Sequence, residues 1–474
     1  MAAPVRFRRG DQAGGRSEGE GVHDKDRRQA RATPPCAAHG AEVFVRAIPS
    51  ASARRCRLSG WHLPWPASGV PGAIRSMTPE LTPPPSRTWP SWLPWVLGVY
   101  LVAGWRRIVP AARTVVHGLP ALRPYMLWAL HHGRYSDIVW LYSLRHLSRH
   151  PLLYIHQRFE YPPLVGLAVW LSTWAPGGLG GYIAVNALLL GAALVASVFV
   201  LARLRGWRIA ALWAATPLLV LYAIYNWDLY GILTWGLAVL AWTRGRYAQS
   251  GLWIGLGAAT KLFPVVLAPY LMASRLAQHD RRGAAVIGGA TAGSWALINL
   301  PLALTARPGW LWFFRYNTVR PPNTLWVVAG WSVPTVNAVT FGLVVGGGLL
   351  LAAAVLTGRL DPTAAAAAAL LWWFACNKVY SPQYSLWALY ACLAARASWK
   401  TAVMLTVVGV LGFQWQWVSL YVSGVHTGWP GIVGPLYPAM VLLSIAILIH
   451  EATVLVRRGW LRSPSRAVPA LKTG

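Results

Sequence analysis

Residues 134–164 read RYSDIVWLYSLRHLSRHPLLYIHQRFEYPPL and interrupt a chain that is otherwise dominated by apolar segments. This stretch holds Asp137 and Glu160, two of only five carboxylates between Trp89 and His450. The other three carboxylates are Asp228, Asp280 and Asp361. An acid beside a membrane costs free energy unless it faces water, protein or a ligand. We therefore interpret residues 134–164 as an extracytoplasmic loop that carries functional side chains.

The composition indicates a membrane protein. Of the 474 residues, 55% are hydrophobic and 12% are charged, and the mean hydropathy is +0.42. A soluble globular protein carries roughly 25% charged residues, about twice this fraction. Apolar runs of membrane-spanning length recur along the chain. The sequence therefore predicts an all-α polytopic membrane protein.

The net charge of +30 does not indicate a nucleic-acid partner. The basic residues lie at the ends of apolar segments and in the N-terminal region, where positive-inside topology and anionic lipid account for them. The cysteines show no CxxC spacing, so neither a disulfide framework nor a zinc site is indicated. They are Cys36, Cys56, Cys376 and Cys392.

The chain divides into three parts. Residues 1–88 are rich in Arg, Pro, Gly and Ala and contain neither a membrane-length apolar run nor a signal-peptide pattern. We interpret them as a disordered, basic cytoplasmic tail. Residues 89–456 form the membrane domain, and residues 457–474 form a second basic cytoplasmic tail.

Alternation of arginine-rich turns with apolar runs predicts about 12 membrane segments and places both termini in the cytoplasm. Residues 162–175 are too short to cross and are expected to form a juxtamembrane helix in the first outer loop. The spans are expected at 92–109, 181–203, 208–225, 228–243, 251–272 (counted as two), 284–304, 332–357, 364–376, 382–396, 401–421 and 430–456.

Residues 251–272 are not expected to cross the membrane as a single helix. Arg244 and Arg246 precede this run and Arg275 follows it, so both flanks are expected in the cytoplasm. The segment should therefore enter the membrane and return as a broken hairpin with Lys261 near its apex. Such a break is tolerated only where it lines a protein interior or a cavity.

On this topology, one face gathers acids and cations suited to group transfer from a lipid phosphate to a hydroxyl. Arginine and lysine bind phosphate oxygens. A carboxylate can accept the proton of an attacking hydroxyl. We take Asp137 as the candidate base. The gathered residues are Asp137, Glu160, Asp228, Arg315, Arg320 and Lys378.

Each candidate has a structural alternative. Asp137 could cap a helix or pair within its loop, Glu160 could pair with Arg158, and Asp228 could be an N-cap. The cations have alternatives too. Lys261 could extend its ammonium to an interface or pair within the hairpin. The outer-face cations could anchor lipid headgroups. These are Arg315, Arg320 and Lys378.

Six segments, in order, resemble glycosyltransferase family 87, and the resemblance covers roughly Trp92 to Val456. The segments are YSDIVWLY with the later FEYPPL, YNWDLYGIL, GLGAATKLFPVVLAP, FFRYNTVRPPNTLW and NKVYSPQYSLW. The resemblance implies a glycosyltransferase-C fold and a polyprenyl-phosphate sugar as donor. It also implies an inverting single displacement in which Asp137 matches the base and Asp228 the second outer-face acid.

The resemblance further implies that the basic residues of the later loops hold the donor phosphate, and we add Lys261 to Arg315, Arg320 and Lys378 as candidates. It favours mannose as the sugar and a glycolipid or envelope glycan as the acceptor. Arabinofuranosyl transfer is the alternative within enzymes, and a lipid or glycan transporter is the alternative outside them. No metal site or other cofactor is indicated, because the histidines lack an HExxH pattern, and a divalent-metal requirement stays open.

Met77 precedes TPELTPPPSRTWPSWLPW, which resembles the start of a typical membrane protein. We hypothesise that translation begins at Met77. Intact-mass spectrometry of the native protein should then give the mass of the chain without residues 1–76. A mass that includes those residues would rule out this start.

Overall fold

A computed structural model describes residues 90–116, 119–120, 125, 128–129, 132–424 and 430–460. The predicted tails therefore lie outside the described residues, except for residues 457–460. Within the described part the chain is α-helical apart from a two-stranded ladder. There β1 (Val115–Val116) pairs antiparallel with β2 (Leu119–Pro120). The predicted all-α class is confirmed.

The helices follow the expected segments closely. They are α1 (Leu93–Ile108), α3 (Asp137–Leu144), α4 (Pro163–Thr173), α5 (Gly178–Arg205), α6 (Trp207–Ala214), α7 (Leu218–Tyr222), α8 (Asp228–Thr243), α9 (Tyr247–Ala258), α10 (Leu267–Ala277), α11 (Arg281–Thr305), α12 (Arg307–Val319), α13 (Trp326–Ala329), α14 (Val333–Leu356), α15 (Pro362–Cys376), α16 (Tyr384–Ala394), α17 (Trp399–Gly424) and α18 (Pro430–Gly459). Short 3₁₀ turns are η1 (Val109–Thr114), η2 (Leu147–Arg149) and η3 (Phe263–Val266).

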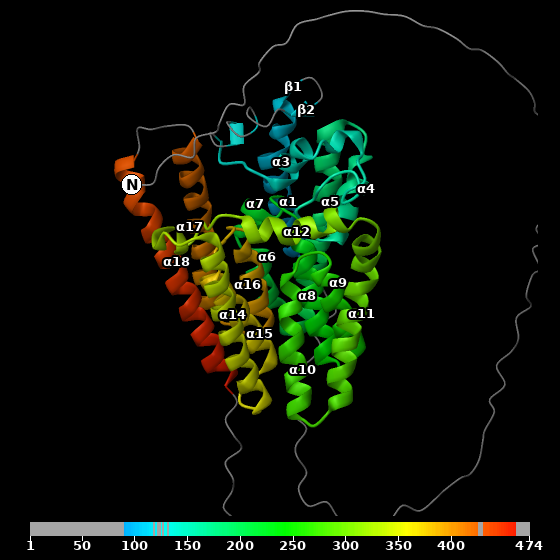
Figure 1. The fold of residues 1–474 in the computed structure, drawn as a ribbon, viewed down its shortest axis with the longest axis vertical. Helices are drawn as coiled ribbons and strands as arrows, with labels where there is room; N and C mark the ends of the chain where they lie inside the picture. The colour runs from blue at the N-terminus through cyan, green and yellow to red at the C-terminus, as the bar shows by residue number, and fades with distance from the viewer. Residues whose placement is uncertain are drawn as a thin grey trace, which may run out of the picture. The chain divides into compact units, whose positions relative to one another are not determined.

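Four of the described helical segments are long and apolar enough to cross a membrane by length and composition. They are Gly178–Arg205, Arg281–Thr305, Val333–Leu356 and Ala439–Gly459. The further apolar helical segments found among the described residues are 10–17 residues long, so the total of about 12 membrane segments stays a prediction. Figure 1 shows α8, α10, α11, α14, α15 and α18 running alongside one another.

The span expected at 208–225 is wrong as a single helix. It is divided into α6 and α7 at residues 215–217. Pro217 has no amide hydrogen to bond to the preceding turn, and it disfavours helical geometry at Thr216. The two short helices pack against α16 and α17 instead of forming one continuous rod.

Glycine spacing brings α9 and α11 into direct backbone contact. Gly251 and Gly255 lie one turn apart, the small-xxx-small arrangement that lets membrane helices approach closely. A Cβ at Gly251 would lie 2.5 Å from the Ile287 carbonyl oxygen, and one at Gly255 would lie 2.1 Å from Ser294 Oγ. The Thr291 hydroxyl donates to the Gly251 carbonyl oxygen at 3.2 Å across the same interface.

The expected broken hairpin at 251–272 is present. Helix α9 ends at Ala258, and the chain turns through residues 259–262 before η3 and α10. The break leaves the Ala259 carbonyl oxygen available, and it accepts from the Leu164 amide of α4 at 2.9 Å. Lys261 lies in this turn beside Asp228, at the start of α8. Helix α8 leads away from that point, α9 returns to it, and α10 leads away again.

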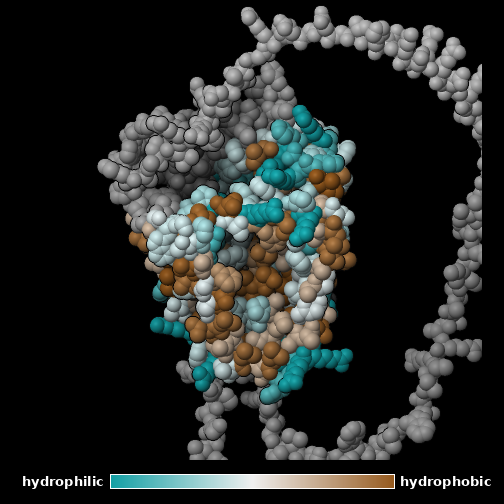
Figure 2. Space-filling view, viewed as in Figure 1, coloured by the Kyte–Doolittle hydropathy of each residue, from teal (hydrophilic) through white to brown (hydrophobic). Residues whose placement is uncertain are grey.

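Helix α12 lies across the ends of the helices below it (Figure 1). Its start packs tightly on the first loop, because a Cβ at Gly309 would lie 1.8 Å from the Tyr154 carbonyl oxygen. Below this level the surface is largely hydrophobic (Figure 2). The exposed fractions of Leu297, Phe341 and Leu350 are 75%, 70% and 75%, as expected of side chains that face lipid.

Gly255→Ala should destabilise the protein by about 1–3 kcal/mol, because the added methyl group collides with Ser294 and Thr291 backbone or side-chain atoms. Thermal unfolding of the purified protein in detergent measures the effect. Gly289→Ala in α11 is the matched control, since a Cβ there meets no atom within 4 Å. Equal melting temperatures for the two variants would contradict this account of the α9–α11 interface.

Candidate active site

A cavity of about 1040 Å³ lies beneath α12. Its walls come from α3, the loop before α4, the hinge between α9 and η3, α12, α14 and the segment that joins α15 to α16. Five of the seven side chains predicted to form the site line it. They are Asp137, Glu160, Lys261, Arg320 and Lys378.

The N-cap residue that precedes Asp137 also bonds to a segment that is distant in the sequence. Ser136 is the N-cap of α3, and its hydroxyl accepts from the Ile138 amide at 3.2 Å. The same hydroxyl lies 2.9 Å from the Ile224 carbonyl oxygen, to which it donates. The Asp137 amide donates to the Tyr225 carbonyl oxygen at 2.9 Å. The start of α3 is therefore attached to the segment just before α8.

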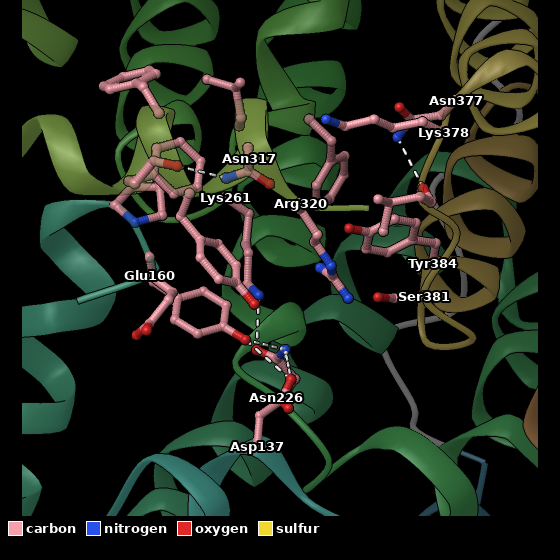
Figure 3. A pocket seen from close by; sticks show the side chains of 18 of the residues that line it. Asp137, Glu160, Asn226, Lys261, Asn317, Arg320, Asn377, Lys378, Ser381 and Tyr384 are labelled. Atoms are coloured by element: carbon pink, nitrogen blue, oxygen red, sulfur yellow. Dashed lines mark hydrogen bonds between the residues drawn. The ribbon is translucent and has the colours of Figure 1, made fainter. Parts of the chain in front are cut away.

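The Asp137 carboxylate receives hydrogen bonds from three neutral donors. Tyr135 donates its phenol to Oδ1 at 2.7 Å. Tyr161 donates to Oδ2 at 3.0 Å, and Asn226 Nδ2 donates to Oδ2 at 2.6 Å. Among the side chains that the structure describes, no cation lies within ion-pair distance of this carboxylate. Figure 3 shows Asp137 and Asn226 converging at one side of the cavity.

The two phenols that bond to Asp137 stay protonated at neutral pH. Burial, and then the adjacent Asp137 carboxylate, raises the pKa of both Tyr135 and Tyr161 well above the ordinary value. Both groups therefore remain donors over the physiological pH range, and they orient the carboxylate without adding charge.

Asp228 is sealed from the cavity. Its side chain has no exposed area, and its Oδ1 atom lies 3.0 Å from Lys261 Nζ. Lys261 also donates to Asn226 Oδ1 at 2.7 Å, and its ammonium lies 4.2 Å from the centre of the Tyr161 ring. Asp228 is the first residue of α8, as expected, but its side chain forms an ion pair and does not cap that helix.

Glu160 forms its ion pair with Arg145 of α3's C-terminal turn. The alternative pairing with Arg158 is wrong, because the Arg158 guanidinium instead lies over the Trp312 ring of α12 at 4.7 Å. Both contacts connect the first loop to neighbouring walls of the cavity. Figure 3 places Glu160 to one side of the Asp137 cluster.

Two cations line the side of the cavity across from Glu160. Arg320 ends α12, and Lys378 follows α15 and donates to the Thr318 carbonyl oxygen at 2.9 Å. No carboxylate among the described residues lies within ion-pair distance of either cation. Burial lowers the pKa of Lys378, and the nearby Arg320 cation lowers it further. Arg315 lies on the exposed face of α12 and does not line the cavity.

The other two membrane-region acids are helix caps. Asp280 accepts from the Gly283 amide at 2.7 Å and pairs with Arg275 at 2.5 Å. Asp361 accepts from the Thr363 and Ala364 amides at 3.0 and 2.9 Å. Such caps satisfy amides that have no partner within the helix. The five carboxylates thus separate into two caps and three cavity-region groups.

The basic and histidine-rich features near the site have structural roles. Arg107 donates to the carbonyl oxygens of Leu221 and Gly133. His146 and His150 do not lie on one helix face. They flank η2 with left-handed backbone angles, and His150 stacks on Trp174.

Sequence reasoning missed the neutral members of the site, Tyr135, Tyr161 and Asn226. Each lies within two residues of a predicted acid, in the motifs YSD, EY and NWD. That adjacency was an available signal. However, tyrosine and asparagine are common at membrane interfaces, and only the folded chain places their polar atoms on Asp137.

Comparisons with known proteins do not assign a family. No protein-family model matches this chain, and no curated protein shows a significant match. Among solved structures, the chain is similar to ArnT from Cupriavidus metallidurans bound to undecaprenyl phosphate. The identity is 16%, the match covers 76% of this chain and 77% of the ArnT chain, and the TM-score is 0.36. The membrane class and the cavity therefore rest on this chain's own sequence and geometry.

Ser136→Ala should destabilise the protein by about 1–3 kcal/mol, because it removes a helix cap and the hydroxyl that donates to the Ile224 carbonyl oxygen. Denaturant or thermal unfolding in detergent measures the loss. Ser332→Ala is the matched control, since that serine is an exposed N-cap whose side chain accepts from Thr335. The control should lose about 0.5–1 kcal/mol, and equal losses would contradict the anchoring role of Ser136.

Proposed function

We propose that this protein is a membrane glycosyltransferase that moves a sugar from polyprenyl phosphate to a hydroxyl of a glycolipid or glycan, with Asp137 as general base. The observation that carries the proposal is the composition of one cavity. It holds a carboxylate oriented by neutral donors together with cations that lack a carboxylate partner among the described residues.

The hydrogen bonds around Asp137 select its reactive oxygen. Oδ2 accepts from both Tyr161 and Asn226, so the directions of both its lone pairs are used. Among the described residues, Oδ1 accepts from Tyr135 alone and keeps a lone pair for a substrate proton. A base must lie within hydrogen-bond reach of the proton it removes, and Asp137 lines a cavity large enough to admit an acceptor hydroxyl.

The side of the cavity that carries Arg320 and Lys378 suits a phosphate attached to a lipid. Arg320 provides a planar fork of donors and Lys378 a compact charge, both suited to phosphate oxygens. The cavity lining also includes apolar side chains of α14, among them Phe341, which is 70% exposed. A polyprenyl chain could lie along this face while its phosphate remains near the cations.

The reaction is a single displacement. The acceptor oxygen forms a bond to the anomeric carbon as its proton passes to Asp137 Oδ1. The bond between that carbon and the phosphate oxygen breaks, and polyprenyl phosphate leaves with the bonding electron pair. The configuration at the anomeric carbon inverts. Arg320 and Lys378 stabilise the negative charge that develops on the leaving phosphate. Positioning of the two substrates contributes the remaining rate enhancement.

We assign the cavity to the extracytoplasmic face and both termini to the cytoplasm. The support is the distribution of arginines. Arg244 and Arg246 lie in the turn between α8 and α9, and Arg281 and Arg282 begin α11; none of the four lines the cavity. Mannose is the favoured sugar, with arabinofuranose as the alternative, because the resemblance of the sequence motifs includes both donors. A metal-independent displacement is consistent with a charged leaving group held by two cations.

Asp137→Asn should reduce sugar transfer by about 10²–10⁴-fold, because an amide keeps the shape of the side chain but cannot accept the proton. Membranes that contain the protein are supplied with polyprenyl-phosphate mannose carrying a radiolabel, and labelled glycolipid or glycan is quantified. The assay is repeated with the arabinofuranose donor.

Asp280→Asn is the matched control, since asparagine can still cap α11 and the site is untouched. Its transfer rate should equal that of the wild type. Undiminished transfer by Asp137→Asn would remove Asp137 as the base. Absence of transfer by the wild type with both donors would favour the transporter alternative.

A further inference from the structure

We propose that Lys261 and Asp228 are positioning residues, which act through Asn226 and Tyr161 to orient the Asp137 carboxylate, and that neither contacts the substrate. This inference rests on the proposed function for its kinetic consequences. It changes the roles expected from the sequence, in which Lys261 binds the donor phosphate and Asp228 is a catalytic acid. The Asn226 amide connects Lys261 to Asp137 by direct hydrogen bonds.

The orientation of the Asn226 amide is determined by its neighbours. One of its terminal atoms receives both Lys261 Nζ, at 2.7 Å, and the Trp227 backbone amide, at 2.6 Å. An ammonium and a backbone N–H can only donate, so that atom must be the oxygen. The nitrogen then faces Asp137 Oδ2 at 2.6 Å and the Tyr161 hydroxyl at 2.7 Å. Lys261 and the Trp227 amide together therefore select the amide orientation that donates to Asp137.

Tyr161 is the second route from Lys261 to Asp137. The ammonium lies 4.2 Å from the centre of the Tyr161 ring, a cation–π contact. The Tyr161 hydroxyl accepts from Asn226 and donates to Asp137 Oδ2 at 3.0 Å. Both donors to Oδ2 thus contact Lys261, and the cation fixes this oxygen while Oδ1 is left for the substrate.

The donor capacity of Lys261 is already used. An ammonium has three hydrogens, and its contacts are with Asn226 Oδ1, Asp228 Oδ1 and the face of the Tyr161 ring. Arg320 and Lys378, by contrast, have no carboxylate partner among the described residues. The phosphate is therefore assigned to those two cations.

Asp228 supplies the counter-charge that allows Lys261 to be buried. The carboxylate has no exposed side-chain area and lies 3.0 Å from the ammonium. A buried cation without such a partner carries a large desolvation cost. Gly231, one turn further along α8, leaves room for the turn between α9 and η3 that holds Lys261. A Cβ at Gly231 would lie 3.0 Å from Lys261 Cβ and 2.6 Å from the Phe263 ring.

The test replaces the pair by neutral groups of similar shape, Lys261→Met with Asp228→Asn. Removing both charges together avoids leaving either one buried and unpaired. We expect kcat for transfer from polyprenyl-phosphate mannose to fall about 10–100-fold, as expected for a misplaced catalytic group. The KM for the donor should stay within about twofold, whereas Arg320→Met should raise that KM about tenfold or more.

A structural readout makes the test independent of turnover. Cryo-electron microscopy of the double variant in lipid nanodiscs should show the same helices, with the Asn226 amide and Asp137 carboxylate displaced or in several orientations. Arg275→Met with Asp280→Asn is the matched control, since it removes an ion pair from the turn before α11. That variant should keep wild-type kcat and an unchanged Asp137 site.

The outcomes separate the two proposals. A wild-type protein that transfers no sugar would refute the proposed function, while the side-chain positions in the variant still test the coupling of Lys261 to Asp137. If the double variant keeps both wild-type kcat and an ordered Asn226–Asp137 contact, the positioning role is wrong. If the double variant has a raised KM for the donor and an unchanged kcat, Lys261 binds the donor phosphate, as the sequence predicted.

Discussion

The buried ion pair between Lys261 and Asp228, 3.0 Å long, is the contact on which the arrangement of the cavity depends. A lysine can occupy this position only because α9 stops at Ala258 and the chain turns before η3. The turn also frees the Ala259 carbonyl oxygen, which binds the first residues of α4. One broken helix therefore joins α8, the hairpin and the first loop around a single buried charge pair.

The cavity keeps its acid and its cations apart. Asp137 is satisfied by two phenols and an amide, so it does not need a cation. Glu160 is paired with Arg145, and Asp228 is paired with Lys261. Arg320 and Lys378 also line the cavity and have no carboxylate partner among the described residues. Neutral hydrogen-bond donors to Asp137 are what allow this acid and two cations to line one cavity without forming an ion pair.

The sequence predicted most helices to within a few residues, including α8, whose bounds at Asp228 and Thr243 match the expectation. Length and hydrophobicity are local properties, and the charged turns that bound each run are local too. The division of the 208–225 segment at Pro217 was missed because its apolar character is continuous across the proline. The partner of Glu160 was also missed, since Arg158 is nearer in sequence but the fold directs it to Trp312.

By itself, the sequence determined the membrane class, the hairpin around Lys261 and the short list of acids and cations from which the site is built. Only the tertiary structure decided which of those groups pair with one another and which line the cavity without a carboxylate partner. Asp137 and Asn226 are 89 residues apart, and Lys261 and Asn226 are 35 apart. Apolar runs and charged turns arise from neighbouring residues, whereas the bonds of the Asn226 amide exist only after three distant segments have packed together.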